Sequence, residues 1–415
     1  MKAVFLNRYF HPDHSATSQL LADLAFDLAA RGRQVAVIAS RQLYDDANAQ
    51  LPRAQTLQGV SIHRVGDSRF GRRNLLGRSF DYLTFCRAAA RRIEEIAAPG
   101  DLVIAMTDPP MLGSFVAGAV RRRGARLVNW LQDLFPEVAE RAGVPLLRGL
   151  LAGPLKQRRD AALRSAAANV AVGETMARYL AEHCGVPGAR IRAIPNWADG
   201  ETLRPVPHEA NPLRLEWGLQ GMFVVGYSGN LGRVHEHGTI LAAMRRLKER
   251  KDMRFLFVGG GSELARLKEA AERERLDIAL FKPYQERGAL AHSLGAADVH
   301  LCVLRPEFEG LVVPSKFYGI AAAGRPAIYV GDPRGEIARL LADHGCGRAV
   351  RTGEGEHLAA LLVDYQGDPG RCRREGDAAR RLLEASFERK IALARWEKLL
   401  EELQERPLPF RPLPD

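Results

Sequence analysis

The sequence has no apolar run long enough to span a membrane, and its few cysteines suggest neither disulfides nor a zinc site. A spanning helix needs about 20 apolar residues, but the most apolar stretch, 311–330, is interrupted by Lys316, Gly324 and Arg325. The five cysteines are odd in number, lie far apart and follow no metal-ligand spacing. Residues 1–7 show no charged-then-apolar leader, so we expect no export and a cytoplasmic location.

Internal repeats and low-complexity tracts are also lacking, which excludes solenoid and fibrous architectures. A chain of 415 residues with 46% hydrophobic content is long enough for two domains with separate cores. We expect an N-terminal domain at 1–200, a C-terminal domain at 201–385, and a helix within 386–415 that crosses back to the N-terminal domain.

Short β-branched runs alternate with helical periodicity in both halves, which predicts two parallel sheets covered by helices. A proline-containing stretch at 195–212 separates the two series and is interpreted as a linker. The predicted strands are 3–6, 34–38, 60–65, 102–105, 126–131, 169–172, 191–194, 223–227, 254–258, 298–303 and 327–330.

The net charge of +11 belongs mainly to the first half. Residues 1–200 contain 27 Lys and Arg against 18 Asp and Glu, a net of +9, which leaves 33 against 31 for the rest. Arginines at 69, 72, 73 and 78 interleave with apolar residues up to 85, and a second cluster combines Arg121 to Arg123 with Arg126. Such a surface suits anionic lipid or a lipid-diphosphate substrate. A solvated arginine-rich face is the open alternative.

Ligands of parallel α/β sheets bind beyond the carboxyl ends of the strands, so the loops there carry the candidates. In the first half, Ser15 and Thr17 stand where a helix should begin, and are expected either to bind an acceptor or to act as N-caps. Asp133 follows the strand at 126–131, where it is expected to bind sugar hydroxyls or to cap the next helix. Asp108 occupies the equivalent place one strand earlier.

The second half carries a glycine-bearing loop after its first strand. Gly229 and Asn230 allow backbone amides to approach phosphate oxygens, and Arg233 supplies charge. Tyr284 and Gln285 are expected to contact a base or to form a turn. Glycines 259–261 lack the spacing and the acidic residue of a dinucleotide fingerprint.

The densest group of candidates lies at 305–326. Glu309 stands beside Gly310 and Leu311, and Ser315 with Lys316 opens a helix. A lysine in the first turn opposes the helix dipole, which a bound diphosphate would explain. His235 and His237, two apart on one loop, are expected to face solvent, and no metal site is predicted.

These segments resemble the bacterial family-4 retaining glycosyltransferases, in the branch that builds O-antigen, capsule or exopolysaccharide on a polyprenyl-diphosphate carrier. The resemblance is carried by YFHP (9–12), DLFPE (133–137), IPNWAD (194–199), SGNLG (228–232) and EGLVVPSK to AAGRP (309–326). It implies the α/β GT-B fold, in which two Rossmann-like domains with parallel sheets face each other across a cleft. It also implies a nucleotide-sugar donor, a lipid-linked glycan acceptor, no cofactor, no obligatory metal and no nucleic acid.

The resemblance implies roles for individual residues as well. Glu309 would contact the donor sugar, whereas the second glutamate of the family, which usually holds the ribose, is replaced by Gly319. Retention requires stabilisation of the departing diphosphate, a role for amides near Gly229 and Gly310 together with Arg233 and Lys316. Asp133 would orient sugar hydroxyls. A nucleotide-sugar 2-epimerase and a non-catalytic scaffold of a polysaccharide assembly complex remain as alternatives.

Overall fold

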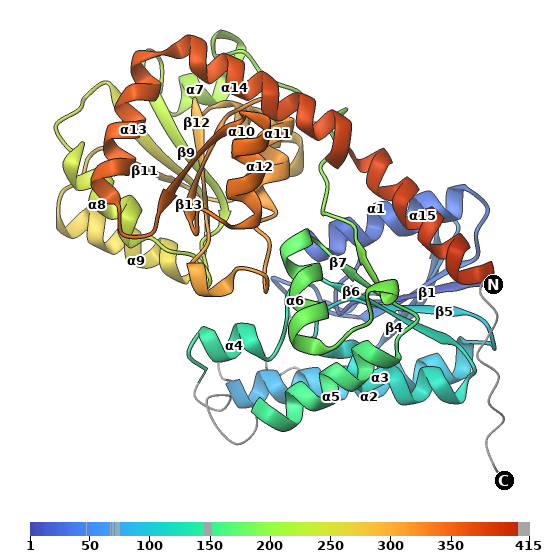
Figure 1. Cartoon of the computed structure of the whole chain (residues 1–415). Helices are drawn as coiled ribbons and strands as arrows, with labels where there is room; N and C mark the ends of the chain where they lie inside the picture. Colours follow the sequence, from blue (N-terminus) through green and yellow to red (C-terminus); the bar gives the residue numbers. More distant parts are fainter. Residues whose placement is uncertain (47, 67, 69, 71–74, 145–151, 406–415) are drawn as a thin grey trace. The chain divides into compact units, whose positions relative to one another are not determined.

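The computed structural model describes residues 1–46, 48–66, 68, 70, 75–144 and 152–405 (Figure 1). The chain divides into two compact units. One contains residues 1–195 together with the chain from Leu393 onward, and the other contains residues 196–392. The division falls at the first residues of the stretch interpreted as a linker. Arg69, Arg72 and Arg73, which belong to the predicted basic surface, lie outside the described residues.

The first unit is built on a sheet whose described strands follow the order β3-β4-β2-β1-β5-β6-β7-β8. Only the β3–β4 pair is antiparallel among these strands. The strands are β1 (Ala3–Leu6), β2 (Val35–Ser40), β3 (Ala54–Leu57), β4 (Val60–Val65), β5 (Leu102–Ala105), β6 (Arg126–Leu131), β7 (Ala168–Ala171) and β8 (Ile191–Ala193). The helices are α1 (Ala16–Ala30), α2 (Leu75–Ile96), α3 (Leu112–Arg122), α4 (Glu137–Arg141), α5 (Ala152–Ser165) and α6 (Glu174–Cys184).

Helices cover both faces of this sheet, which explains why β1 and β5 are apolar throughout and β2 is apolar up to its last residue, Ser40. Side chains of α2 and α3 pack on one face. On the other face, Trp396 of α15 (Arg389–Glu405) is fully buried, with its ring 4.6 Å from that of Trp130 in β6. Ion pairs from Arg31 to Glu397 at 2.9 Å and from Arg33 to Glu401 at 3.1 Å attach the same helix to α1 and the turn after it.

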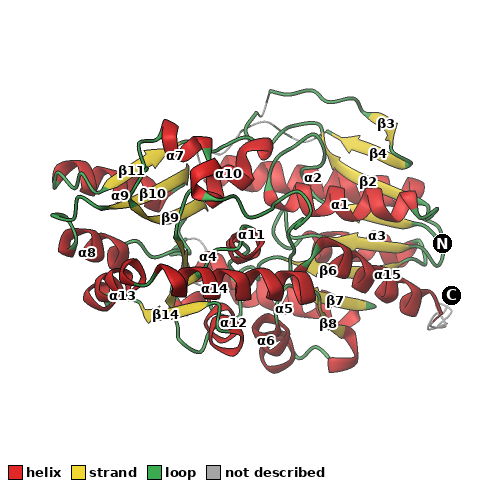
Figure 2. Cartoon of the chain, turned by 90° about the horizontal axis from the view of Figure 1, so that it is seen from above, coloured by secondary structure: helices red, strands yellow, loops and turns green. Residues whose placement is uncertain are grey.

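The second unit has a parallel sheet in the order β11-β10-β9-β12-β13-β14. Figure 2 shows β11, β10 and β9 of this sheet side by side. Its strands are β9 (Phe223–Asn230), β10 (Met253–Gly260), β11 (Ala279–Lys282), β12 (Val299–Val303), β13 (Ala327–Gly331) and β14 (Gly347–Arg351). Its helices are α7 (Pro212–Glu216), α8 (Gly238–Arg246), α9 (Ser262–Arg273), α10 (Leu290–Gly295), α11 (Lys316–Ala322), α12 (Glu336–His344), α13 (Gly355–Gly367) and α14 (Pro369–Leu382). The order places its first strand, β9, beside its fourth, β12, so the direction of winding changes between them.

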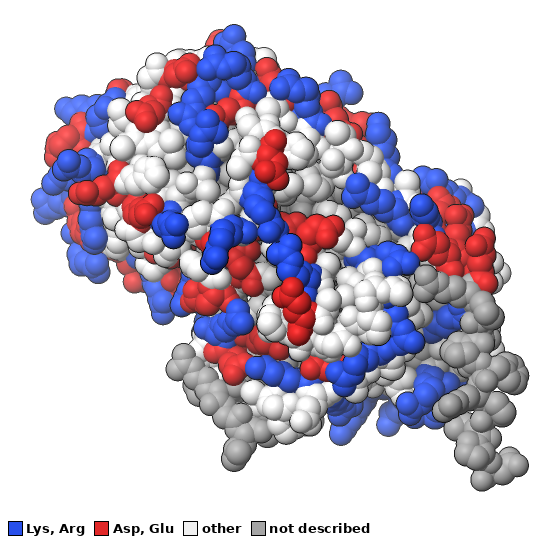
Figure 3. Space-filling model, in the orientation of Figure 1, with Lys and Arg blue, Asp and Glu red and all other residues white. Residues whose placement is uncertain are grey.

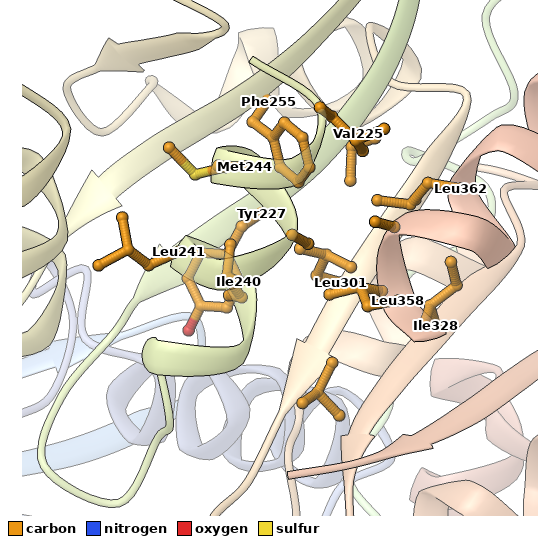
Figure 4. Close-up of a cluster of buried hydrophobic side chains, with 14 of the residues drawn as sticks. Val225, Tyr227, Ile240, Leu241, Met244, Phe255, Leu301, Ile328, Leu358 and Leu362 are labelled. Atoms are coloured by element: carbon orange, nitrogen blue, oxygen red, sulfur yellow. The ribbon is translucent and has the colours of Figure 1, made fainter. Parts of the chain in front are cut away.

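The core of the second unit lies between this sheet and helices α8 and α13 (Figure 4). Val225, Leu301 and Ile328 point from the strands toward Met244 of α8 and Leu362 of α13, and all five are at most 1% exposed. This packing fixes the strands whose carboxyl ends carry the candidate residues. Both units are therefore Rossmann-like α/β units with parallel sheets, as predicted.

Two predictions about strands need correction. β9 extends to Asn230 and β10 to Gly260, so Gly229 is the second-last residue of a strand rather than part of a loop. Strands β3, β11 and β14 were not predicted, and each lies at an edge of its sheet. Edge strands are covered less completely, so their sequences lack the continuous apolar run of a central strand.

Candidate active site

A cavity of about 240 Å³ lies in the second unit, at the carboxyl ends of β9 and β10. This is the place beside the change in winding where open α/β sheets bind ligands. The strands, α10, α11 and the segment after β11 each contribute to its lining. The lining residues are Ser228, Gly229, Val258, Tyr284, Gln285, Leu290, Ser293, Leu294, Ser315, Lys316, Gly319 and Ile320.

Lys316, the first residue of α11, supplies the positive charge of this cavity. Its Nζ lies 3.2 Å from His235 Nε2 and 5.4 Å from the centre of the Tyr227 ring. Burial lowers the pKa of the Lys316 ammonium to about 8, because a charged group loses hydration in the interior. A bound anion would restore that stabilisation, so the position suits a phosphate group.

The Lys316 side chain packs against the backbone of Gly229, where no side chain stands in its way. The backbone of Gly229 has a φ of +114°, which L side chains rarely adopt, and a Cβ there would lie 3.1 Å from Lys316 Cε. A residue without a side chain is therefore required by conformation and by proximity.

His235 does not face solvent, so that prediction is wrong. It is 8% exposed, and its Nδ1 lies 3.0 Å from the Gly232 nitrogen and 3.2 Å from the Gly232 oxygen. Burial, with the charge of Lys316 adding to it, lowers the pKa of His235 to about 3. His237 instead pairs with Glu263 at 2.9 Å. Among the described residues, no group of three or more His, Cys, Asp or Glu is arranged to hold a metal; independence from metal stays a prediction.

Glu309 lies outside the cavity lining and contacts the segments that follow. Its carboxylate accepts hydrogen bonds from the Tyr329 hydroxyl of β13 and, at 3.4 Å, from the Glu336 N–H at the start of α12. Burial raises the pKa of this carboxyl. In the structure, Glu309 therefore ties the segment before α11 to β13 and α12. Its predicted contact with the donor sugar stays a prediction.

The other donor-binding candidates divide into two groups. Gly229, Tyr284, Gln285, Ser315 and Lys316 meet at the cavity. The remaining four lie outside its lining: Asn230 and Arg233 are exposed, Gly310 follows Glu309, and Leu311 is fully buried. Sequence reasoning missed Ser293, whose buried hydroxyl has no hydrogen-bond partner in the described structure.

The glycine run at 259–261 does not open an anion site at α9. The Glu263 N–H donates to the Leu231 oxygen at 2.9 Å, and the Leu264 N–H donates to the same oxygen at 3.3 Å. The amides of the second and third residues of α9 are thus already used within the unit.

Asp133 marks the candidate site of the first unit. It follows β6, its Oδ1 is buried without a hydrogen-bond partner, and it lines a cavity of about 30 Å³. Burial raises the pKa of Asp133 to about 6; the charge of Asp108 adds to the shift, and a hydrogen bond from Thr107 opposes it. α4 begins at Glu137 with Pro136 at its N-cap, so Asp133 does not cap that helix. An unpaired carboxylate oxygen at a strand exit is suited to accept a hydroxyl.

The start of α1 is held by internal contacts. Ser15 stands at the N-cap position, but its hydroxyl donates to Asp13 at 2.5 Å instead of capping the helix. Thr17 accepts from the Asn7 amide at 3.3 Å. Acceptor binding by Ser15, Thr17 and Asp108 stays a prediction.

The second arginine cluster is largely engaged within the first unit. Arg122 pairs with Glu94 at 2.5 Å, Arg123 donates to the Ala97 oxygen at 2.8 Å, and Arg126 donates to the Leu403 oxygen. Figure 3 shows Lys and Arg of the second unit intermixed with Asp and Glu on the face that it draws, as the near-balance of charge there requires. Of the other cluster, the structure describes Arg78, which is exposed and donates to the Tyr82 hydroxyl at 2.6 Å. An anionic partner for either cluster stays a prediction.

Comparison with known protein families identifies both halves of the chain. Residues 17–201 match the family described as Glycosyltransferase Family 4, and residues 216–382 match Glycosyl transferases group 1. The chain is a glycosyltransferase. The glycosyltransferase is 29% identical over 300 residues to the probable glycosyltransferase WbjE of Pseudomonas aeruginosa, a match that covers 71% of this chain and 73% of WbjE.

A second relative is the putative colanic acid biosynthesis glycosyl transferase WcaI of Escherichia coli K12. It is 29% identical over 222 residues, which cover 52% of this chain and 54% of WcaI. Sucrose-phosphate synthase from Thermosynechococcus elongatus has the same fold, with a TM-score of 0.77 at 16% identity over 97% of this chain and 98% of that protein. Anabaena HepE in complex with UDP follows, with a TM-score of 0.71 at 16% identity over 97% and 100% of the two chains.

These likenesses confirm the predicted GT-B fold and the predicted class of enzyme. Among the described helices of the glycosyltransferase, none combines the length and the apolar character that crossing a bilayer requires.

Proposed function

We propose that this glycosyltransferase takes a sugar from a nucleotide-diphosphate donor bound in the cavity of its second unit, and transfers it to a lipid-linked glycan with retention at the anomeric carbon. The observation that carries the donor site is a buried lysine at the carboxyl end of the sheet, on the wall of the cavity. Crystal structures of HepE, which shares the fold, contain UDP or UDP-glucose and support a nucleotide-sugar donor.

The composition of the cavity fits such a ligand. Lys316 offers an ammonium to the diphosphate, and no carboxylate stands in the described lining to repel it. Val258, Leu290 and Leu294 offer apolar surface to a nucleoside, whereas Ser293 and Gln285 can exchange hydrogen bonds with its polar edges. Ligand sites usually combine an apolar lining with a few placed polar groups in this way.

The proposed transfer needs charge stabilisation rather than a metal. The bond between the anomeric carbon and the diphosphate oxygen breaks while the acceptor hydroxyl forms its bond on the same face. The hydroxyl proton passes to the departing phosphate. Lys316, held in a water-poor site, stabilises the negative charge that develops there. Arg233 and the amides near Gly229 and Gly310 are proposed to assist, and Glu309 and Asp133 to orient sugar hydroxyls.

The acceptor is proposed to bind the first unit, where Asp133 presents its unpartnered oxygen and where Asp108, Ser15 and Thr17 lie near strand ends. The name of WcaI refers to colanic acid biosynthesis, which supports a role in surface polysaccharide assembly. A polyprenyl-diphosphate glycan is the acceptor that we infer.

Peripheral attachment to the inner face of the membrane is part of this proposal. Phe70, Phe80 and Leu83 are 62%, 52% and 40% exposed, and Arg78, on the same helix as Phe80 and Leu83, is exposed as well. Apolar side chains that insert beside a basic one favour an anionic bilayer surface. Co-sedimentation with anionic liposomes at low and high salt tests this, and absence of binding at both salt concentrations would remove it.

The test of the donor site is calorimetric titration with UDP, GDP and ADP, with and without magnesium. We expect one nucleotide to bind without metal and Lys316→Ala to lose that binding. Lys268→Ala, at an exposed lysine of α9, is the matched control and should bind as the wild type does. If no nucleotide binds at millimolar concentration, the donor site is refuted and the non-catalytic scaffold becomes the better interpretation.

A further inference from the structure

His235 lies against Lys316, yet the donor site as proposed assigns it no part. The two residues are distant in the sequence, and the Nζ–Nε2 distance of 3.2 Å is within reach of a hydrogen bond. His235 is buried against Tyr227 of β9, with the rings at 82° and their centres 6.5 Å apart. No other hydrogen bond of the Lys316 ammonium involves the described side chains or backbone. Two of its three N–H groups are thus left for a ligand.

Two tautomers of a neutral His235 ring fit its contacts, and each matches one protonation state of Lys316. With its hydrogen on Nδ1, the ring donates to the Gly232 oxygen at 3.2 Å, and Nε2 accepts from the Lys316 ammonium. With its hydrogen on Nε2, the ring accepts from the Gly232 N–H at 3.0 Å and donates to an uncharged Lys316 amine. A neutral imidazole carries one donor and one acceptor, so the two contacts must change together.

Burial keeps the surrounding titratable groups neutral. It lowers the pKa of His235 to about 3 and raises the pKa of the Cys302 thiol of β12 to about 12. It also raises the pKa of the Tyr227 hydroxyl, which donates to the Asn230 oxygen at 2.9 Å. The charge of Lys316 is therefore the variable one in this group.

We propose that His235 is a positioning residue for the donor diphosphate: its neutral ring holds the Lys316 ammonium at the cavity wall and adopts the tautomer that matches the charge of that lysine. The inference rests on the proposed donor site. It goes further, because diphosphate binding, which favours the ammonium, would then draw His235 into the Nδ1–H tautomer. The ring would couple the loop at Gly232 to the presence of the donor.

The first test compares two substitutions by calorimetric titration with UDP, GDP and ADP. His235→Leu removes the acceptor for Lys316 and should weaken binding of the nucleotide by about tenfold. His235→Gln keeps an oxygen acceptor at the reach of Nε2 and should bind within about threefold of the wild type. Wild-type affinity in the leucine variant would overturn the inference.

The second test reads the tautomer directly and does not depend on either variant folding. In protein labelled with ¹⁵N-histidine, the two ring nitrogens have distinct chemical shifts in each tautomer. At pH 9, where most of the empty protein has an uncharged Lys316 and the Nε2–H ring, addition of the bound nucleotide should move His235 to the Nδ1–H form. In the empty protein, raising the pH through about 8 should move it to the Nε2–H form, since Lys316 then loses its proton. Lys316→Met should abolish both changes.

The outcomes separate the two proposals. If no nucleotide binds the wild type, the donor site fails, whereas the pH-dependent change of tautomer still tests the pair itself. If the nucleotide binds but the tautomer changes neither with nucleotide nor with pH, the donor site stands and the role of His235 is overturned.

Discussion

Replacing Lys316 by methionine should stabilise the empty enzyme while removing its affinity for the donor. The pKa of this lysine falls from 10.5 to about 8 on folding. At pH 7 the unfolded chain therefore holds its proton more tightly than the folded chain, and the charged side chain costs the folded state about 3 kcal/mol. Methionine has a similar length and no charge, so it removes this cost.

The gain is reduced because His235 loses its partner. A lost hydrogen bond to a buried group costs about 1–2 kcal/mol, which leaves a net stabilisation of about 1–2 kcal/mol. For a unit of this size, that corresponds to an increase in melting temperature of about 2–8 °C. The stability difference between Lys316→Met and the wild type should shrink as pH rises from 8 toward 10.5. Over that range the wild-type lysine becomes neutral in the folded protein, so burying it no longer destabilises the fold.

Differential scanning calorimetry at pH 7 and pH 9.5, without and with nucleotide, measures both effects. The wild type should gain stability from the nucleotide and Lys316→Met should not. Lys268→Met, at an exposed lysine, controls for the loss of a charge. A variant less stable than the wild type at pH 7 would refute the reasoning, since burial of a charge would then not dominate at this position.

Three further predictions follow from the same contacts. Nucleotide affinity should be constant between pH 7 and 8 and then fall by up to about tenfold per unit above 8, as measured by calorimetry, because the free enzyme loses the Lys316 proton; a flat profile to pH 9.5 would contradict this. Gly229→Ala should weaken nucleotide binding by about tenfold, because a positive φ is strained for alanine and the new Cβ displaces Lys316; unchanged affinity would show that the lysine position is not critical. Transfer activity should rise from pH 5 to 7 as Asp133 ionises near pH 6, and Asp133→Asn should lower it and remove that rise; persistence of the rise would assign it to another group.

Several strands were predictable because burial in a sheet requires a recognisable pattern of apolar residues in the sequence. β1 and β5 are buried along their whole length and have the predicted bounds, since a strand covered on both faces is apolar along its length. β4 and β6 also have the predicted bounds; in β4 buried residues alternate with partly buried ones, which is the period-two pattern of a strand. β14 was missed, with arginine at its second and fifth positions. An edge strand pairs with only one neighbour, and its other side is open to solvent. Its conformation therefore depends on the neighbouring strand, which a five-residue segment of sequence does not reveal.

The cavity was predictable in part for a similar reason. Lys316 and Gly229 stand at strand ends or helix starts, where sequence and topology together indicate a ligand site. His235 was misjudged because its burial results from packing against Tyr227 and Lys316, the latter 81 residues further along the chain. Ser293 is a helical serine like many others, and only the fold of α10 brings it to the cavity.

The position of α15 has a consequence for how the protein is made. The first unit is not continuous in the chain: its sheet is covered by Trp396 only after residues 196–392 have been synthesised. At about 5–20 residues per second, the ribosome needs roughly 10–40 s to make that intervening unit. During this interval Trp130 and the face around it lack their final cover. A chaperone that shields one apolar face of a nascent sheet should therefore act on this protein before its second unit is complete.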